Sequence, residues 1–193
     1  RDRSPSRGLG DVYKRQLIYY YIQSNKITEA TEMANKLVTD DPNSKLAWFM
    51  KGAIELNVKK DYAAAIASCD KALAIDPNYK DALFNKGTAY INDIYDQTHG
   101  GKKFQYIGTN RRITGKASDG SYQKQKAIYD KEVAYVKGYY ENALKCMERV
   151  RELAPNEAKR WAPSLQMVYS ALGQKNKAKE MDDLLDAANK AGN

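Results

Sequence analysis

The feature that most constrains the fold of this chain is the stretch from residue 61 to residue 77, DYAAAIASCDKALAIDP. Ala65, Cys69 and Ala72 recur at four- and three-residue spacing, which predicts an amphipathic helix whose inner face carries only small side chains. An Asp-Pro dipeptide then ends the helix, because proline cannot continue it. A second helix can therefore approach the small-residue face closely.

The same signals return at a fixed interval along the chain. Ala30 and Ala65 lie 35 residues apart, and so do Pro42 and Pro77. A period of this length is typical of helical repeat proteins, in which each helix pair completes its core by stacking on the next pair. The interval therefore predicts a stack of helix pairs.

Trp48 and Gly52 stand four residues apart on the expected partner helix of the 61–77 segment. The tetratricopeptide repeat is a unit of 34 residues with a characteristic order of residue types: Trp, then Leu-Gly, then Tyr, then Ala, an aromatic residue and Pro. The chain resembles this family over nearly all of residues 17–190. The resemblance implies an all-α fold, a right-handed α-solenoid of helix-turn-helix repeats. We expect the one residue beyond 34 to lie in the surface turn around residues 57–60.

Residues 1–16 are predicted to be non-native, because residues 6–16, SRGLGDVYKRQ, resemble translated adapter sequence from a DNA sequencing library. The native sequence is then expected to start near Leu17, inside a helix, as a fragment that lacks its N-terminus. Residues 17–193 are predicted to form one solenoid domain. Its repeats are expected at 17–44, at 45–79, at 80–96 plus 138–157, and at 158–190.

The third repeat is predicted to be interrupted, because Pro77 and Pro155 are 78 residues apart. The expected insertion covers residues 97–137. Its first part, 97–121, is rich in Gly, Thr and Ser without a helical period, which predicts a long loop. A short hairpin that pairs 104–107 with 112–114 is an alternative within it. Its second part, 122–137, is predicted to be a helix that runs toward the second helix of the repeat.

Net charge is +8 for the whole chain. Residues 1–16 hold five Lys or Arg and two Asp, so the remainder carries +5. This excess is too small by itself to indicate nucleic acid binding. The hydrophobic fraction of 42 % suits a helical domain with a continuous core. No apolar run approaches the roughly 20 residues of a membrane helix, so no membrane span is expected.

Residues suited to catalysis are scarce. Nucleophilic or metal catalysis needs converging His, Cys, Asp or Glu side chains, and the one histidine, His99, lies in a Gly-rich segment. Cys69 and Cys146 are predicted to be small buried residues rather than a disulfide. Residues 108–117, GTNRRITGKA, resemble a phosphate-binding loop, but the glycine spacing is wrong and Ala117 replaces the magnesium-binding Ser or Thr. We therefore expect no enzyme, metal, cofactor or small-molecule substrate.

The family resemblance implies that the first helix of each pair lines a concave groove that binds peptides. The side chains predicted to contact a partner are Phe49, Ala53, Asn57, Asp81, Phe84, Thr88 and Asn92, with Leu56 and Ile91 beside them. The alternative is that Phe49, Phe84 and Ile91 only pack against neighbouring helices. Chaperone-binding members grip a terminal carboxylate with Lys and Asn, and neither occurs at the matching positions. The groove is therefore expected to prefer a segment with apolar anchors.

A second candidate surface is the predicted loop. Its basic residues are Lys102, Lys103, Arg111, Arg112 and Lys116, with aromatic side chains interleaved at Phe104, Tyr106 and Tyr122. Basic and aromatic residues together can bind phosphates and stack bases. An acidic protein or another anionic polymer is equally compatible with these charges. The remaining possibility is a solvated loop that binds nothing.

These patterns predict a non-catalytic scaffold that binds a protein or peptide partner on the concave face of the solenoid. The alternative is an anionic partner, such as a nucleic acid, an acidic protein or a polymer, on the basic loop; nucleic acid is the less favoured of these. Residues 139–173 also resemble the C-terminal parts of tetratricopeptide proteins of gut-type Gram-negative bacteria, many of which look exported. The resemblance implies the periplasm or cell envelope, with the cytoplasm as the alternative.

Overall fold

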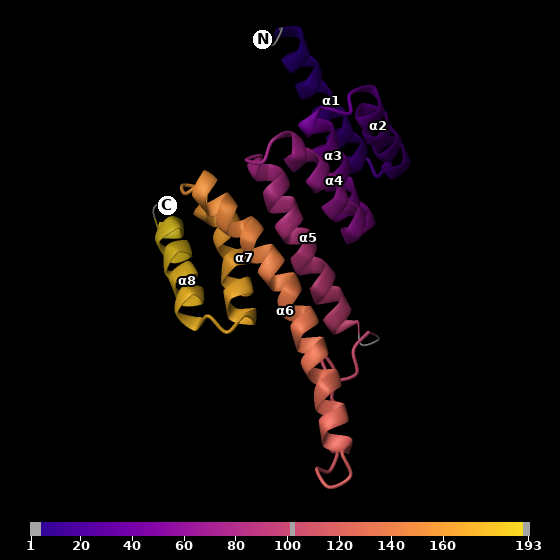
Figure 1. Cartoon of the computed structure of the whole chain (residues 1–193). Helices are drawn as coiled ribbons and strands as arrows, with labels where there is room; N and C mark the ends of the chain where they lie inside the picture. Colours follow the sequence, from indigo (N-terminus) through magenta and orange to yellow (C-terminus); the bar gives the residue numbers. More distant parts are fainter. Residues whose placement is uncertain (1–4, 101–102, 191–193) are drawn as a thin grey trace. The chain divides into compact units, whose positions relative to one another are not determined.

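The structure is a computed structural model that describes residues 5–100 and 103–190, with only the backbone described for residues 5–12 and 15 (Figure 1). All regular structure in these ranges is helical, which confirms the all-α class. The elements are α1 (Pro5–Gln23), α2 (Ile27–Asp40), α3 (Lys45–Ile54), the π-helical turn η1 (Glu55–Lys59), α4 (Tyr62–Ile75), α5 (Lys80–His99), α6 (Ser121–Leu153), α7 (Ala158–Ala171) and α8 (Lys175–Lys190).

The chain divides into two compact units, Arg1–Lys86 and Gly87–Asn193. The division falls inside α5. The first unit contains two complete helix pairs, α1 with α2 and α3 with α4. The second contains most of α5, then α6 and the pair α7 with α8. The extent of a single solenoid domain over residues 17–193 stays a prediction.

The turns after α2, α4 and α6 share one hydrogen-bonding pattern. They are built on Asp-Pro-Asn at 41–43 and 76–78 and on Ala-Pro-Asn at 154–156. In each turn, the residue before proline donates its amide to the carbonyl four residues back, at 2.9–3.0 Å, and accepts from the amide three residues ahead at 3.0 Å. The proline supplies no amide and loses no hydrogen bond there. The predicted stop signals are therefore three copies of one turn.

Two tryptophans attach a first helix to the turn that precedes it. Trp48 Nε1 donates to the carbonyl of Pro42 at 2.8 Å, and Trp161 Nε1 donates to the carbonyl of Ala154 at 2.9 Å. Trp161 is buried, and a buried indole normally needs such an acceptor; Trp48 is half-buried and makes the equivalent bond. The tryptophan therefore fixes the angle at which the first helix leaves the turn.

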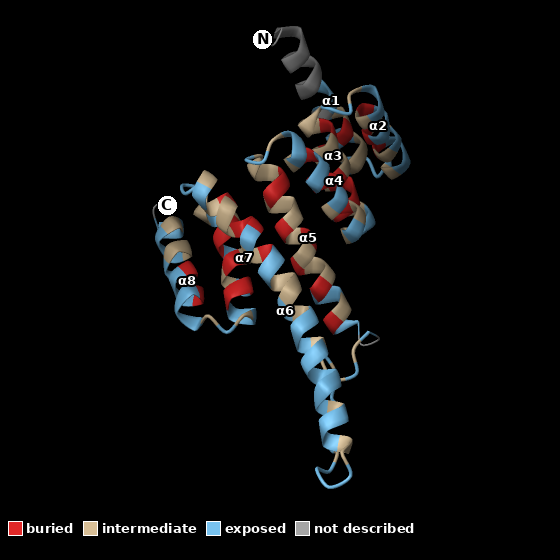
Figure 2. Ribbon diagram, in the orientation of Figure 1, coloured by how far each residue is buried: buried red, intermediate tan, exposed pale blue. Residues whose placement is uncertain are grey.

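Small side chains let α3 and α4 approach closely, as their spacing predicts. Ala65, Cys69 and Ala72 are fully buried on α4, and Figure 2 shows buried residues on this helix. A Cβ atom on Gly52 would lie 3.3 Å from Cys69 Sγ and 3.3 Å from Ser68 Cβ. Cys69 and Cys146 are both buried, and they form no disulfide with each other.

The extra residue of the 35-residue repeat is accommodated within the helix. The turn η1 (Glu55–Lys59) has π-helical hydrogen bonding, which fits one more residue into a helical turn. It ends at Lys60 in the left-handed conformation, with φ 53°. Glu55 is 6 % exposed, accepts a hydrogen bond from Ser68 Oγ at 2.5 Å and pairs with Lys51. The extra residue thus lies near the expected place, but it belongs to a π-helical turn rather than to an irregular surface turn.

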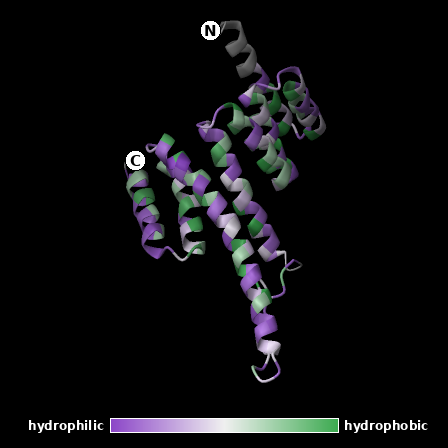
Figure 3. Ribbon diagram, in the orientation of Figure 1, coloured by the Kyte–Doolittle hydropathy of each residue, from purple (hydrophilic) through white to green (hydrophobic). Residues whose placement is uncertain are grey.

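In the second unit, α6 joins two helices that the sequence analysis treats separately. The predicted helix at 122–137 continues through Gly138 into the second helix of the third repeat without a break. The C-terminal half of α6 packs against α7, and the core contains Met147, Val150, Leu165 and Tyr169. The N-terminal half is largely exposed in Figure 2, and in Figure 3 its hydrophilic residues are interrupted by hydrophobic ones.

The close contact between α3 and α4 leads to a prediction about the stability of the fold. Ala65→Leu should overpack this contact and lower the free energy of unfolding by about 1–3 kcal/mol, measured by urea denaturation. Ala63→Leu on the exposed side of the same helix is the matched control, and it should change stability little because Ala and Leu have similar helix propensities. Equal stability of the two variants would contradict the predicted register.

Candidate functional site

The first-helix face of the first unit is built around Phe49. Its ring is half-buried and meets Tyr79 edge-on, with ring centroids 5.4 Å apart and an interplanar angle of 63°. Lys45 lies over the other ring, 5.0 Å from the Tyr79 centroid, and also pairs with Asp76. Ala53 is half-buried one turn further along α3. Phe49 is thus supported from one side by a ring at the start of the next repeat, and it keeps part of its surface exposed.

Asn57 occupies η1, and part of its amide is used inside the helix. Its Nδ2 donates to the carbonyl of Ala53 at 3.0 Å. A π-helical turn shifts backbone hydrogen bonds by one residue, so a side-chain donor at this point supplies a partner for a helix carbonyl. The Asn57 carbonyl oxygen remains at an exposed position. Asn57 therefore stabilises the turn as well as lying on the predicted face.

The predicted partner residues of α5 are all half-buried: Asp81, Phe84, Thr88 and Asn92. Their three- and four-residue spacing places them along one stripe of the helix. Leu56 and Ile91 behave differently, because they are only 3 % and 7 % exposed. The expectation that these two side chains line a groove is wrong, since both are core residues.

The basic connection, residues 103–120 between α5 and α6, is ordered by side chains of α6. The Glu132 carboxylate accepts three consecutive backbone amides, from Gln105 at 2.6 Å, Tyr106 at 3.0 Å and Ile107 at 3.1 Å. Partial burial raises the pKa of this carboxyl, but the three amides together outweigh that effect and hold the pKa below its usual value. One ionised glutamate therefore fixes the start of the connection.

Gln125 fixes the second half of the connection in the same way. Its Oε1 accepts the amides of Thr114 at 2.9 Å and Gly115 at 3.2 Å. The predicted hairpin between 104–107 and 112–114 is therefore wrong, because these backbone amides donate to α6 rather than to each other. The predicted start of the loop at 97 is also wrong, since Gln97–His99 continue α5. Gly108 has φ 69°, and a Cβ there would lie 1.8 Å from the Thr98 carbonyl oxygen, so only glycine fits.

Aromatic side chains form a second set of contacts between the connection and α6. Phe104 packs on Tyr135 with centroids 5.8 Å apart, and Tyr106 meets Tyr129 at 6.3 Å. The hydroxyls of Tyr135 and Tyr139 lie 3.0 Å apart. Burial, followed by this hydrogen bond, raises the pKa of Tyr139 to about 12. Phe104 and Tyr106 are therefore used in internal packing.

The predicted basic residues fall into three groups. Lys103 donates to Gln97 Oε1 at 2.5 Å and to the Tyr135 hydroxyl at 2.7 Å, so its ammonium group already has two hydrogen-bond partners within the chain. Lys102 lies outside the described residues. The other three are exposed, and none has a side-chain hydrogen bond or ion pair with another described residue: Arg111, Arg112 and Lys116.

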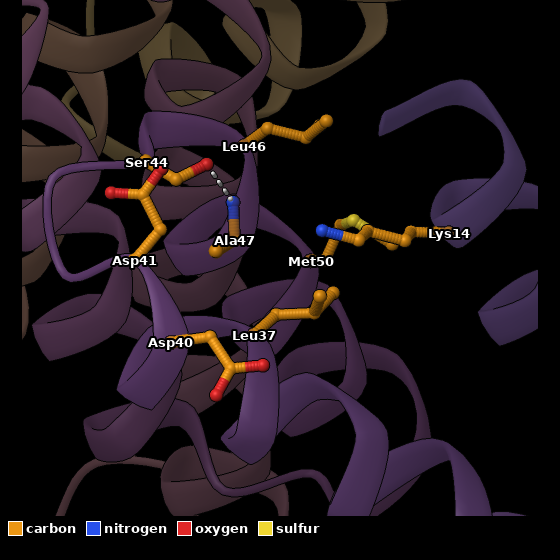
Figure 4. A pocket seen from close by; sticks show the side chains of 8 residues that line it. All are labelled: Lys14, Leu37, Asp40, Asp41, Ser44, Leu46, Ala47 and Met50. Carbon is orange, nitrogen blue, oxygen red and sulfur yellow. Dashed lines mark hydrogen bonds between the residues drawn. The ribbon is translucent and has the colours of Figure 1, made fainter. Parts of the chain in front are cut away.

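A small hollow in the first unit lies between α1, α2 and α3 (Figure 4). Its lining mixes apolar and polar side chains: Lys14, Leu37, Asp40, Asp41, Ser44, Leu46, Ala47 and Met50. The hydrogen bond in the figure is the N-cap of α3, where Ser44 Oγ accepts the Ala47 amide at 3.2 Å. Lys14 belongs to the segment predicted to be non-native, so this hollow offers no firm site.

The second unit holds a more apolar hollow that the sequence analysis missed. Its lining comes from the basic connection, from α6 and from the end of α7: Ile107, Val133, Val136, Lys137, Tyr140, Ala171 and Leu172. The only sequence signal was the three- and four-residue spacing of Val133, Val136 and Tyr140. Ile107 and Leu172 join them only through the tertiary fold.

Residues 5–100 and 103–190 contain no cluster of metal-binding side chains and no candidate membrane-spanning helix. No three His, Cys, Asp or Glu side chains in these ranges are arranged to hold a metal ion. His99 instead stacks on Tyr95, with ring centroids 4.0 Å apart. Within the same ranges, none of the helices has the length and apolar character needed to cross a bilayer.

Comparison with known proteins points to one repeat type. Residues 47–79 match the family model described as tetratricopeptide repeat. The crystal structure of MamA is similar with a TM-score of 0.60 and 16 % identity, covering 94 % of this chain and 80 % of that one. The NMR structure of the first TPR domain of human RPAP3 has a TM-score of 0.55 and 20 % identity, covering 87 % and 96 %. Such identities establish similarity of fold. None of the curated proteins compared with the chain matches it.

The role of Glu132 can be tested by hydrogen exchange. Glu132→Ala should speed amide exchange at residues 105–107 by about tenfold or more, because three charge-assisted hydrogen bonds are lost. Asp130→Ala, which removes a carboxylate that pairs with Lys126 on the same helix, is the control. Protection in the unchanged chain should persist above the usual glutamate pKa and disappear as the pH falls through the lowered value. Unchanged exchange in Glu132→Ala would contradict this anchoring.

Proposed function

Because residues 47–79 form a tetratricopeptide repeat and the described helices have the fold of tetratricopeptide proteins, we propose that this chain is a non-catalytic scaffold that binds a peptide on its first-helix face. This fold commonly serves in protein-protein interaction. Within the first unit the proposed site consists of Phe49, Ala53, Asn57, Asp81 and Phe84. Thr88 and Asn92 continue the same stripe of α5 in the second unit.

The observation that carries the proposal is the environment of Phe49. The ring is held edge-on by Tyr79, so its position is defined without a partner, and yet it is not fully buried. Ala53, one turn away, has a side chain too small to cover the ring from that direction. A partner residue can therefore bury apolar surface against a preorganised aromatic ring, which is how hot-spot residues contribute most of the affinity.

The chemistry of this face favours apolar anchors over a terminal carboxylate. The side chains one turn apart on the two first helices are Phe49 with Ala53 and Phe84 with Thr88, and none is cationic. The nearest cations in sequence, Lys51 and Lys86, already pair with Glu55 and Asp70. Lys45 pairs with Asp76. The expected ligand is therefore an extended or helical segment with apolar side chains at regular spacing.

Peptides selected by phage display on the unchanged chain provide a test that needs no known partner. Ala53→Arg should weaken their binding by about tenfold or more, because the added side chain covers the site without removing a packed ring. Phe84→Asp should abolish binding, and added salt should matter little. Ile75→Asp, which places a charge at an exposed position of the second helix α4, is the control.

A further replacement separates this face from the basic connection. Residues 103–120 exchanged for a Gly-Ser linker should leave the selected peptides bound. Loss of binding with the linker, together with unchanged binding to Ala53→Arg, would contradict the proposed face.

A further inference from the structure

The apolar hollow of the second unit has a defined shape and an open side. Val133, Val136 and Tyr140 lie on one face of α6, Ile107 of the basic connection forms one wall, and Leu172 forms another. The hollow has a volume of about 180 Å³. A cavity of about 150 Å³ lined by apolar side chains holds a molecule the size of benzene. The hollow is therefore large enough for one leucine or phenylalanine side chain.

The lining leaves apolar surface in contact with water. Val133 is 37 % exposed, and the other side chains of the hollow are half-buried or exposed. The backbone amide of Ile107 donates to the Glu132 carboxylate, so the position of this wall is fixed before a ligand binds. Filling a preformed apolar hollow recovers hydrophobic free energy without the cost of ordering the site.

The charge around the hollow indicates the kind of partner. Between residues 103 and 140 there are eight basic residues, Lys103, Arg111, Arg112, Lys116, Lys124, Lys126, Lys131 and Lys137, against three acidic ones, Asp119, Asp130 and Glu132. Each of the three carboxylates already accepts internal hydrogen bonds. This part of the molecule therefore presents a positive field to an approaching partner.

Lys137 is the charged residue of the hollow itself. Its side chain is 61 % exposed, and its ion pair with Glu141, at 3.4 Å, is a surface pair one helical turn apart. Such pairs contribute little and exchange readily for another carboxylate. If a partner places an apolar side chain in the hollow, an acidic residue next to that side chain can form an ion pair with Lys137 at the rim of the hollow.

From this arrangement we propose that the hollow binds an acidic peptide segment, whose single leucine or phenylalanine enters it while flanking carboxylates face Lys137 and the cations of the basic connection. A nucleic acid fits less well. Its backbone has no aliphatic group to fill the hollow, and Phe104 and Tyr106 pack on α6 rather than standing free to stack on bases. This site is independent of the first-helix face.

Fluorescence polarisation with the full chain tests the site. The probe is a short labelled peptide with a central leucine flanked on both sides by glutamates. Its leucine-to-serine version and a labelled oligothymidylate of equal charge are the comparisons. The leucine peptide should bind about tenfold more tightly than the serine peptide, because only leucine buries apolar area. Equal binding of the two peptides, or tighter binding of the oligonucleotide, would overturn the proposal.

Matched variants locate the binding on the molecule. Val133→Glu should weaken the leucine peptide by about tenfold, because it adds a carboxylate inside the hollow. Ile128→Glu makes the same change at an equally exposed position of α6 that does not line the hollow, and it should have an effect of less than about twofold.

Lys137→Glu should weaken the leucine peptide more than Lys36→Glu, which makes the same change in net charge on α2. Circular dichroism melting of all four variants confirms that the fold is kept. Equal loss in both members of either pair would overturn the assignment to the hollow.

Discussion

The hydrogen bonds of the proline turns are the constraint on which the helix pairs depend. The same two backbone bonds recur after α2, α4 and α6, at 2.9–3.0 Å, and each turn passes the chain to the next first helix in one conformation. In two of these places a tryptophan adds a bond from the first helix to the turn. These bonds join residues within a few positions of one another, so a repeated sequence gives a repeated turn, and each helix pair is then stabilised by its neighbours.

Close packing then decides which side chains each pair can leave for a partner. Small residues of α4 fill the contact with α3, while the larger Phe49 packs against the edge of the core, rests on Tyr79 and keeps part of its surface exposed. Leu56 and Ile91, by contrast, are buried in the core. The first-helix face therefore consists of those side chains of α3 and α5 that the core does not bury completely.

The second unit departs from this regular plan by lengthening α6. The N-terminal half of that helix is largely exposed, and the basic connection contacts part of it. Glu132 and Gln125 supply acceptors to five backbone amides, so the irregular segment pairs its amides without forming a strand. Because the segment is held against α6, Ile107 forms one wall of the apolar hollow.

The sequence by itself determined the helical class, the period, the stop signals and the inner faces, as Ala65, Cys69 and Ala72 illustrate. Each of these depends on neighbours within a few residues, whose effects are readable in order along the chain. The course of the basic connection was decided only by the tertiary structure, because the acceptor of the Ile107 amide is a carboxylate 25 residues away. The burial of Ile91 and the assembly of the hollow are likewise outcomes of packing between distant segments, for which a periodic pattern carries no signal.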